Sequence, residues 1–238
     1  MNAASAPERD GKADTTHPET PSGERAYDPG RVWYRYARAL LPASPGRWLD
    51  LGCGRGEFLD GAPATAALGG LDRSLESARA VRAAGRVGLV ADLEAPLPLP
   101  SKSLDGASLI EVIEHVIGAE QLVDELARVL RPGAWLIVTT PNVAHLTYRW
   151  RALTGHPPKQ EGYHLRFFTK KTLRACFEAR GFRIEARASF GKQALLSRVG
   201  RLLGAPAGSK VRYPVPGPLE PLLAQHFVWR LVRAGTSA

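Results

Sequence analysis

A glycine-rich segment directly after a short apolar run is the part of the chain best suited to bind a nucleotide-type ligand. Residues 47–56 read Arg-Trp-Leu-Asp-Leu-Gly-Cys-Gly-Arg-Gly, so Asp50 stands two residues before the first of three glycines, Gly52, Gly54 and Gly56. Glycines let the main chain approach a ligand closely, and a helix that opens after such a turn offers N–H groups to it. The spacing G-x-G-x-G differs from the G-x-G-x-x-G of dinucleotide-binding enzymes. The segment therefore predicts a cofactor site, and its spacing disfavours NAD.

Acidic residues stand at the ends of the next three predicted strands. Asp72 ends the second strand, where a carboxylate can accept both hydrogen bonds of a ribose diol. Asp92 ends the third, where an acid can accept an adenine amino hydrogen while Leu93 covers the ring. Glu111 ends the fourth. Any one of these acids is equally suited to cap a helix. Together they favour one ligand lying along the carboxyl ends of the strands.

The segment Asp50–Gly56 resembles motif I of the class I S-adenosylmethionine (SAM) dependent methyltransferases. Arg131-Pro132-Gly133, before the fifth predicted strand, adds to the match, which covers roughly residues 31–190 and is similar to the ubiquinone-type (type 11) and type 23 methyltransferase domains. The resemblance implies direct methyl transfer without a covalent enzyme intermediate. It implies that SAM is held by Asp50, Gly52, Gly54, Gly56, Asp72, Asp92, Leu93 and Glu111.

Strands and helices alternate along the predicted domain. This alternation predicts an α/β fold with a parallel sheet covered by helices on both faces. The resemblance implies a doubly wound, seven-stranded, mostly parallel sheet with an antiparallel last strand. The predicted strands are 47–51, 67–72, 87–92, 107–111, 134–140, 182–189 and 227–232. The predicted helices are 29–41, 56–62, 74–84, 119–130 and 170–180, with a long loop at 141–168.

Two glutamates and two histidines are the candidates for the chemistry at the acceptor. Glu111, Glu114 and His115 follow the fourth strand within one turn, and His164 lies in the long loop 141–168, a length that is usually functional. Methyl transfer to a hydroxyl requires alignment of the acceptor and removal of its proton. Glu114, His115 and His164 are therefore candidate catalytic residues. A packing role for His115, or a loop-anchoring role for His164, is the alternative.

The stretch E-x-x-E-H resembles two groups of methyltransferases. The O-methyltransferases of ubiquinone biosynthesis share it, and the small-RNA 2′-O-methyltransferases use such a stretch, with a further histidine, to hold a divalent metal. The second resemblance implies a metal on Glu111, Glu114, His115 and His164, with Mg²⁺ or Mn²⁺ as the ion. A metal there would lower the pKa of the acceptor hydroxyl.

The positive charge of the chain is concentrated near its C-terminal end. The net charge is +9, and residues 166–238 hold 14 basic and three acidic side chains. Within a predicted insertion at 191–221, apolar residues at helical spacing alternate with basic ones ahead of a proline-rich stretch. Such a segment can pack on the sheet, cover the acceptor pocket or lie on an anionic membrane. The basic third could also meet RNA phosphates, although it contains no recognised RNA-binding module.

Composition predicts the organisation and the location of the chain. Residues 1–28 nearly lack large apolar side chains and are predicted to be disordered, and residues 29–238 form one predicted methyltransferase domain. Two cysteines, no signal sequence and no apolar run of about 18 residues predict a cytoplasmic protein, with a peripheral position at the inner membrane face as an alternative.

The functional prediction is SAM-dependent methylation of a hydroxyl, with nitrogen or carbon as less favoured acceptor atoms. The acceptor is a small-molecule, sugar or lipid-like compound. A metal-assisted RNA 2′-O-methyltransferase and a non-catalytic SAM-binding partner protein are the alternatives.

Overall fold

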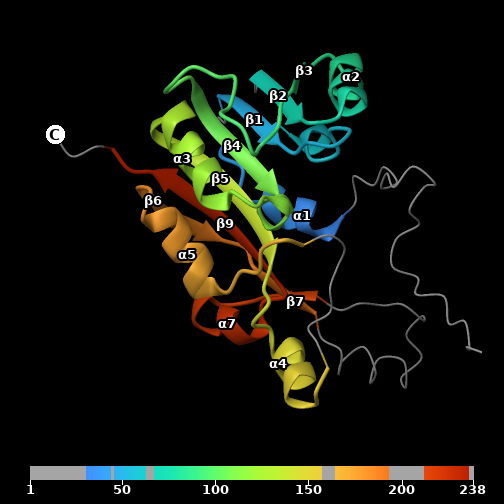
Figure 1. The fold of residues 1–238 in the computed structure, drawn as a ribbon, viewed down its shortest axis with the longest axis vertical. Helices are drawn as coiled ribbons and strands as arrows, with labels where there is room; N and C mark the ends of the chain where they lie inside the picture. Colours follow the sequence, from blue (N-terminus) through green and yellow to red (C-terminus); the bar gives the residue numbers. More distant parts are fainter. Residues whose placement is uncertain (1–30, 44–45, 63–66, 157–163, 193–211, 236–238) are drawn as a thin grey trace, which may run out of the picture.

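The computed structural model describes residues 31–43, 46–62, 67–156, 164–192 and 212–235. Within these residues a central sheet runs through the molecule and helices pack against it (Figure 1). The strands are β1 Arg47–Leu51, β2 Ala67–Asp72, β3 Val87–Val90, β4 Leu104–Ile110, β5 Leu130–Pro141, β6 Phe182–Arg187, β7 Phe190–Lys192, β8 Arg212–Pro214 and β9 His226–Arg233. The α-helices are α1 Val32–Arg38, α2 Leu75–Ala83, α3 Ala119–Val129, α4 Leu146–Leu153, α5 Lys170–Glu178 and α7 Glu220–Leu223. Three 3₁₀ turns are η1 Leu59–Gly61, η2 Ile113–His115 and η3 Gly217–Leu219.

The sheet is parallel at its centre and antiparallel at one side. Its order is β3-β2-β1-β4-β5-β9-β7-β8, and β6 also pairs with β9. Strands β1 to β5 pair in parallel, whereas β9 runs antiparallel to both β5 and β6. This arrangement confirms the predicted α/β class with a mostly parallel sheet. The carboxyl ends of β1, β2 and β4 therefore meet at one edge, as the ligand-binding hypothesis requires.

The described part of the sheet has nine strands, two more than the resemblance implies. The additional pair is the hairpin of β7 and β8, which joins the sheet where Phe190 pairs with His226. Strands of three residues are too short to produce a readable period of two, so the sequence pattern does not reveal them.

Several predicted boundaries differ from the structure. The segment 56–62 was predicted as a helix but forms only η1, because Gly54 (φ +52°) and Gly56 (φ +91°) hold the chain outside the helical region. The predicted long loop 141–168 contains α4, whose N-cap His145 accepts a hydrogen bond from the N–H of Thr147. The predicted tail 1–28 lies outside the described residues, as does most of the predicted insertion 191–221.

Apolar side chains fill both sides of the sheet. Helix α3 buries Leu122, Val123, Leu126 and Val129 against one face, at the spacing of a single helical stripe. On the other face Tyr34 of α1 packs with Phe58 and Trp48. Helix α1 is thereby fixed beside the glycine-rich turn. Among the described residues, no helix combines the length and apolarity that crossing a bilayer requires.

Candidate active site

The turn after β1 needs glycine for steric reasons. Gly52 has a φ of +70°, and a Cβ at this position would lie 2.6 Å from Cγ2 of Val112. The main chain folds back toward β2, where the carbonyl of Leu71 accepts hydrogen bonds from the N–H groups of Gly52 (2.7 Å) and Cys53 (3.1 Å). The turn is thus a surface of bare main chain pinned to the neighbouring strand.

Asp72 connects this turn to the start of α2. One carboxylate oxygen accepts the N–H of Gly54 and the other accepts the N–H of Ser74, each at 2.9 Å. Ser74 is in turn the N-cap of α2. Asp72 therefore fixes the shape of the turn, and its remaining lone pairs can still accept hydrogen bonds from a ligand.

Asp50 lies beneath the turn rather than in the wall of a cavity. Its side chain is only 3% exposed, and its Oδ1 accepts a hydrogen bond of 2.6 Å from the hydroxyl of Ser108 on β4. Burial raises the pKa of Asp50 to about 7, although the hydrogen bond from Ser108 opposes this shift. A direct contact between Asp50 and SAM stays a prediction.

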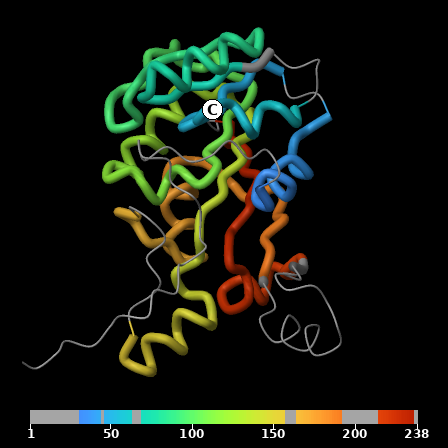
Figure 2. Tube along the Cα trace, turned by 90° about the vertical axis from the view of Figure 1, so that its right-hand side faces the viewer, coloured from blue at the N-terminus to red at the C-terminus, as the bar shows by residue number. Residues whose placement is uncertain are grey.

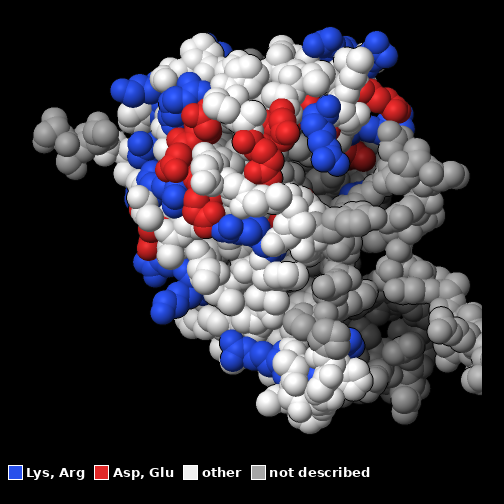
Figure 3. Space-filling view, viewed as in Figure 1, with Lys and Arg blue, Asp and Glu red and all other residues white. Residues whose placement is uncertain are grey.

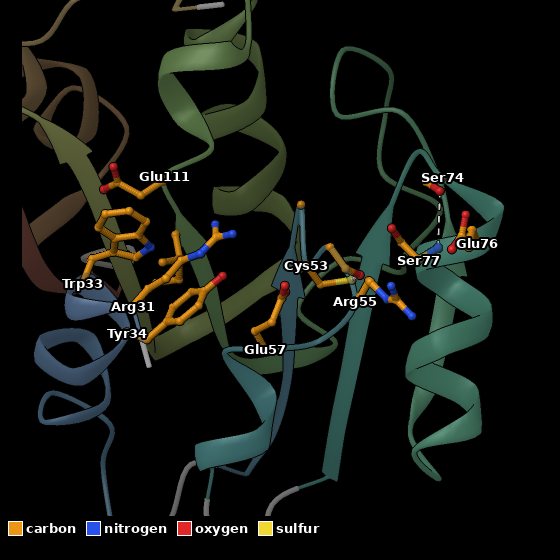
Figure 4. Close-up of a pocket in the computed structure, with 13 residues that line it drawn as sticks. Arg31, Trp33, Tyr34, Cys53, Arg55, Glu57, Ser74, Glu76, Ser77 and Glu111 are labelled. Carbon is orange, nitrogen blue, oxygen red and sulfur yellow. Dashed lines mark hydrogen bonds between the residues drawn. The ribbon is translucent and has the colours of Figure 1, made fainter. Parts of the chain in front are cut away.

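A cavity of about 240 Å³ opens at the carboxyl ends of β1 and β4. Figure 4 shows Arg31, Trp33, Tyr34 and Glu111 on one side of it and the start of α2 on the other, with Glu57 between. The wall of the cavity contains both positively and negatively charged side chains. The lining residues are Arg31, Trp33, Tyr34, Gly52, Cys53, Gly54, Arg55, Glu57, Ser74, Glu76, Ser77, Ile110 and Glu111.

Helix α1 supplies a wall of the cavity, and none of its residues is among the predicted site residues. Arg38 at the end of α1 donates hydrogen bonds to the carbonyl oxygens of Glu57 and Phe58, directly after the glycine turn. This attachment places Trp33 and Tyr34 over the cavity. Burial, followed by the nearby carboxylate of Glu57, raises the pKa of the Tyr34 hydroxyl, so it stays neutral. The only feature of the sequence that could have indicated this wall is the pair of adjacent aromatic residues in a short helix before motif I.

Glu111 at the end of β4 is paired with a histidine from the far end of the chain. Its Oε2 lies 3.2 Å from Nε2 of His226, and its Oε1 accepts a hydrogen bond of 2.8 Å from the hydroxyl of Thr139. The backbone of Glu111 has a φ of +56°, which is uncommon for a residue with a side chain and occurs often at functional sites. His226 received no role from the sequence, because it stands alone in an apolar strand.

Aromatic rings hold His226 in place. Its ring stacks on Phe190 at a centroid distance of 5.3 Å and lies 5.7 Å from the ring of Trp33. Burial would raise the pKa of Glu111, but the charge and hydrogen bond of His226, together with the bond from Thr139, hold that pKa below its ordinary value. Glu111 is therefore ionised near neutral pH.

The other three predicted acceptor-side residues form a cluster, one member of which, His164, also helps to lower the pKa of Glu111. One possible ligand atom from each of Glu114, His115 and His164 lies within 4.8 Å of the others. The carbonyl of Glu114 accepts the N–H groups of Leu165 and Arg166, each at 2.9 Å, which brings His164 beside His115. The two imidazole centroids are 4.9 Å apart. Glu111 was predicted to join this metal set, but its carboxylate is directed to His226 instead.

Glu114 is the most deeply buried of the three. It is 1% exposed, and its Oε2 accepts a hydrogen bond of 3.0 Å from the hydroxyl of Thr140. His115 and His164 are half-buried. Ligand atoms on one ion lie roughly 3.0–3.5 Å apart at metal–ligand bonds of about 2.1 Å. The upper bound of 4.8 Å on the separations within the cluster includes this spacing.

Asp92 and Leu93 lie away from the cavity wall. Strand β3 ends at Val90, and Asp92 beyond it is exposed and accepts a hydrogen bond of 3.0 Å from the N–H of Glu94. Leu93 is half-buried against the core. Their contact with an adenine ring stays a prediction.

A family model and two curated relatives all identify this chain as similar to methyltransferases. A family model described as "Methyltransferase domain" matches residues 26–187. Over 175 residues the chain is 34% identical to a "Probable S-adenosylmethionine-dependent methyltransferase" of Mycolicibacterium smegmatis, a match that covers 69% of this chain and 65% of that protein. It is 33% identical over 131 residues to the "Ubiquinone biosynthesis O-methyltransferase" of Xylella fastidiosa, covering 49% of this chain and 50% of the relative. These matches therefore span between half and two thirds of the relatives' length.

The fold is also found among solved structures. A protein from Thermotoga maritima, described as a SAM-dependent methyltransferase and "possible histamine N-methyltransferase", superposes with a TM-score of 0.60 at 22% identity. The match covers 84% of this chain and 87% of that one. At this identity the likeness establishes the fold alone.

Proposed function

The chain belongs to the class I SAM-dependent methyltransferases, and from this premise we propose that it transfers the methyl group of SAM to a hydroxyl of a small-molecule, sugar or lipid-like acceptor. The proposal rests on a single observation. One cavity is bounded by bare main chain of the glycine turn at one end and by the ionised Glu111 at the other. The first end suits a nucleoside cofactor and the second suits a proton-bearing acceptor.

The turn fits an adenosyl cofactor because a side chain would fill the space beside it. A Cβ on Gly52 would collide with Val112, so the turn is shaped for close approach of a ligand to the main chain. In this proposal Asp72 at the end of β2 accepts hydrogen bonds from the ribose diol with the lone pairs that the N–H groups of Gly54 and Ser74 leave available. Arg31 in the cavity wall complements a carboxylate such as that of the methionyl group.

Glu111 is the group best placed to receive the acceptor's proton. SAM, when bound, supplies an electrophilic methyl group, and the acceptor hydroxyl must lose its proton as it attacks. Glu111 lines the cavity, and His226 keeps its carboxylate ionised without itself reaching the wall. His226 is thus a positioning residue. The cluster of Glu114, His115 and His164 is the alternative acid–base group.

Calorimetry tests the cofactor end of the proposal. Titration with S-adenosylhomocysteine is expected to give heat and to yield a micromolar dissociation constant. This constant corresponds to a binding free energy of about −8 kcal/mol. Release of S-adenosylhomocysteine from SAM is then followed with hydroxyl-bearing metabolite fractions. No binding by folded protein contradicts the proposal. Binding without release for any fraction would favour the non-catalytic SAM-binding alternative.

The variant His226→Gln tests the acceptor end. Loss of the imidazole removes the main group that holds the pKa of Glu111 down, so the acidic limb of the kcat profile should move to higher pH. We expect kcat to fall about tenfold while the affinity for S-adenosylhomocysteine stays within roughly threefold. His156→Gln is the control, because His156 is exposed beyond the end of α4 and its imidazole contacts the hydroxyl of Thr154. Equal pH profiles for His226→Gln and the unchanged protein would remove the assigned role.

A metal-assisted form of the reaction is a second candidate, favoured by the proximity of Glu114, His115 and His164. Two imidazoles and one carboxylate suit Mn²⁺ better than Mg²⁺. A bound ion would lower the pKa of the acceptor hydroxyl. Titration with Mn²⁺, followed by electron paramagnetic resonance, should show one site that His115→Gln removes. A rate unchanged by EDTA, with no Mn²⁺ bound, would exclude this form and with it the metal-assisted RNA 2′-O-methyltransferase.

A further inference from the structure

Helix α4 presents an apolar stripe to solvent. None of its eight residues, all of which the structure describes, is buried. Leu146, Trp150 and Leu153 are 52%, 67% and 81% exposed, and their spacing of four and three residues places them on one face. The ribbon in Figure 1 and the Cα tube in Figure 2 both show α4 projecting beyond the sheet, at the opposite end from β3 and α2. Burying large apolar side chains is favourable, so this stripe is expected to have a partner.

A groove with a basic rim lies beside the stripe. It has a volume of about 560 Å³ and separates the start of α4 from α5. Arg149 links the two features, since it follows Leu146 on α4 and also lines the groove. The groove is lined by Ala144, Arg149, Thr169, Lys170, Lys171, Arg174, Ala175, Glu178 and Pro221. Four of these nine residues are cationic and one is anionic.

Local contacts neutralise only part of this positive charge. The amine of Lys170 lies 3.0 Å from the buried carboxylate of Glu220, and Arg174 pairs with Glu178 at 2.7 Å. Arg149, by contrast, donates to the carbonyl oxygen of Ala144, which carries no net charge. Lys171 is exposed on the first turn of α5. On the face drawn in Figure 3, the described surface around α4 and the start of α5 shows Lys and Arg but no Asp or Glu.

We propose that α4 and the adjoining groove form a docking surface for a bilayer that contains anionic lipid. Trp150, Leu146 and Leu153 enter the boundary between headgroups and acyl chains, which is the depth that an indole and leucines favour on an interfacial helix. Arg149 and Lys171 contact the lipid phosphates, and their attraction adds to the apolar burial. This inference does not depend on the proposed methyl transfer.

Charge complementarity selects this occupant over two others. A second copy of the chain would place an identical basic groove against the first across a two-fold axis, and like charges would then face each other. RNA would satisfy the cations but would leave the apolar stripe in water, because a phosphate backbone offers it no apolar partner. An anionic bilayer satisfies both features at once.

Vesicle binding by the full chain tests the proposal with Trp150 as an internal reporter. Trp48, Trp135 and Trp229 are buried and Trp33 lies at the cavity, so Trp150 is the strongly exposed member of the five tryptophans. Vesicles of phosphatidylcholine with about one third phosphatidylglycerol should shift the emission to shorter wavelength, and brominated lipid should quench it. Trp150→Phe should abolish the shift and quenching but retain most of the binding measured by sedimentation.

Substitutions separate the apolar and electrostatic contributions. The double variant Trp150→Ser with Leu153→Ser should weaken vesicle binding at least about tenfold, and Arg149→Glu with Lys171→Glu should remove the preference for anionic over pure phosphatidylcholine vesicles. The matched controls are Val87→Ser and Arg79→Glu at the opposite end of the molecule, which should leave binding unchanged. Affinity for S-adenosylhomocysteine and the melting temperature establish that each variant is folded.

Three results would overturn the proposal. The first is absence of binding to anionic vesicles by the unchanged chain. The second is equal loss of binding in the control variants. The third is a blue shift of Trp150 emission that depends on protein concentration without vesicles and coincides with a dimer in sedimentation analysis, since this would identify a second copy as the occupant.

Discussion

The two ends of the cavity are built in different ways. The proposed cofactor end is made mainly of main chain from neighbouring segments, in which Gly52 and Gly54 are connected to Leu71 and Asp72 on the adjacent strand. The proposed acceptor end is made of side chains from segments far apart, in which Glu111, directly after β4, meets His226 of β9.

This difference explains why one end identifies a superfamily and the other does not. A surface of bare main chain suits the cofactor, which all reactions of the superfamily share. Only glycine leaves the main chain bare enough for a ligand to approach this closely. A side-chain surface is changed by single substitutions and by the choice of surrounding loops. The following tests, in order of decreasing effect, examine whether the two ends are separate in function as they are in construction.

Gly52→Ala should cause the largest loss. The new Cβ would meet Val112 at 2.6 Å in a backbone conformation that costs about 1–2 kcal/mol for alanine, so the turn must move. We expect the affinity for S-adenosylhomocysteine, measured by calorimetry, to fall roughly 1,000-fold.

The control for this variant is Gly85→Ala. Gly85 also has a positive φ of +75°, but a Cβ there has no atom within 4 Å. It should lower stability by a similar backbone cost and leave cofactor affinity unchanged. A large loss of affinity in Gly85→Ala would indicate that instability, rather than the shape of the turn, explains the first result.

Glu111→Gln should damage turnover without comparable damage to cofactor binding. The amide preserves the size of the side chain but cannot accept a proton, so kcat should fall about 100-fold. The affinity for S-adenosylhomocysteine should change less than roughly threefold. Glu185→Gln, which alters a glutamate paired with Arg230 on the surface of the sheet, is the matched control. Equal losses of kcat and affinity would mean that the two ends are not separable.

Asp72→Asn should weaken cofactor binding moderately. Both carboxylate oxygens accept main-chain N–H groups, and an amide can accept only one of them. We expect about a tenfold loss of affinity, equivalent to about 1.4 kcal/mol. Asp105→Asn offers the comparison, because Asp105 also accepts a main-chain N–H, that of Arg47, but lies at the start of β4 rather than at its carboxyl end. An effect of the same size in Asp105→Asn would argue against a specific role for Asp72.

Asp50→Asn should have the smallest effect, seen in stability. The pKa of Asp50 is raised to about 7 by burial, while the unfolded chain releases this proton near its ordinary value of 3.8. The folded state therefore loses stability as pH rises from about 4 to 7, and the loss is complete above that range. Asn removes this loss but buries an amide N–H₂, so the net gain at pH 8 is about 1 kcal/mol.

Urea unfolding at pH 5 and pH 8 measures this effect. The stability of Asp50→Asn should vary less with pH than that of the unchanged protein. Ser108→Ala removes the hydrogen bond that opposes the shift, and should make the decline with pH steeper. Identical pH dependence in all three proteins would contradict the assignment of the decline to Asp50.

The sequence predicted the α/β class, the parallel centre of the sheet and the family. It also predicted that Gly52, Gly54 and Asp72 would meet, because they are at the ends of adjacent parallel strands. It predicted the proximity of Glu114, His115 and His164 through a family resemblance, since no spacing rule connects His164 to the other two. Glu111 lies outside the cluster of these three residues, because its carboxylate is paired with His226, and its role as a metal ligand stays a prediction.

The sequence by itself determined those features that depend on a few consecutive residues: the glycine turn, the strand–helix alternation and the identity of the cofactor they suit. Only the tertiary structure decided which side chain faces Glu111, that α1 closes one wall of the cavity, and that α4 lies beside the basic start of α5. The physical reason is that main-chain conformation follows from local sterics. Contacts between distant side chains depend on the order in which strands join the sheet, and residue spacing does not encode that order.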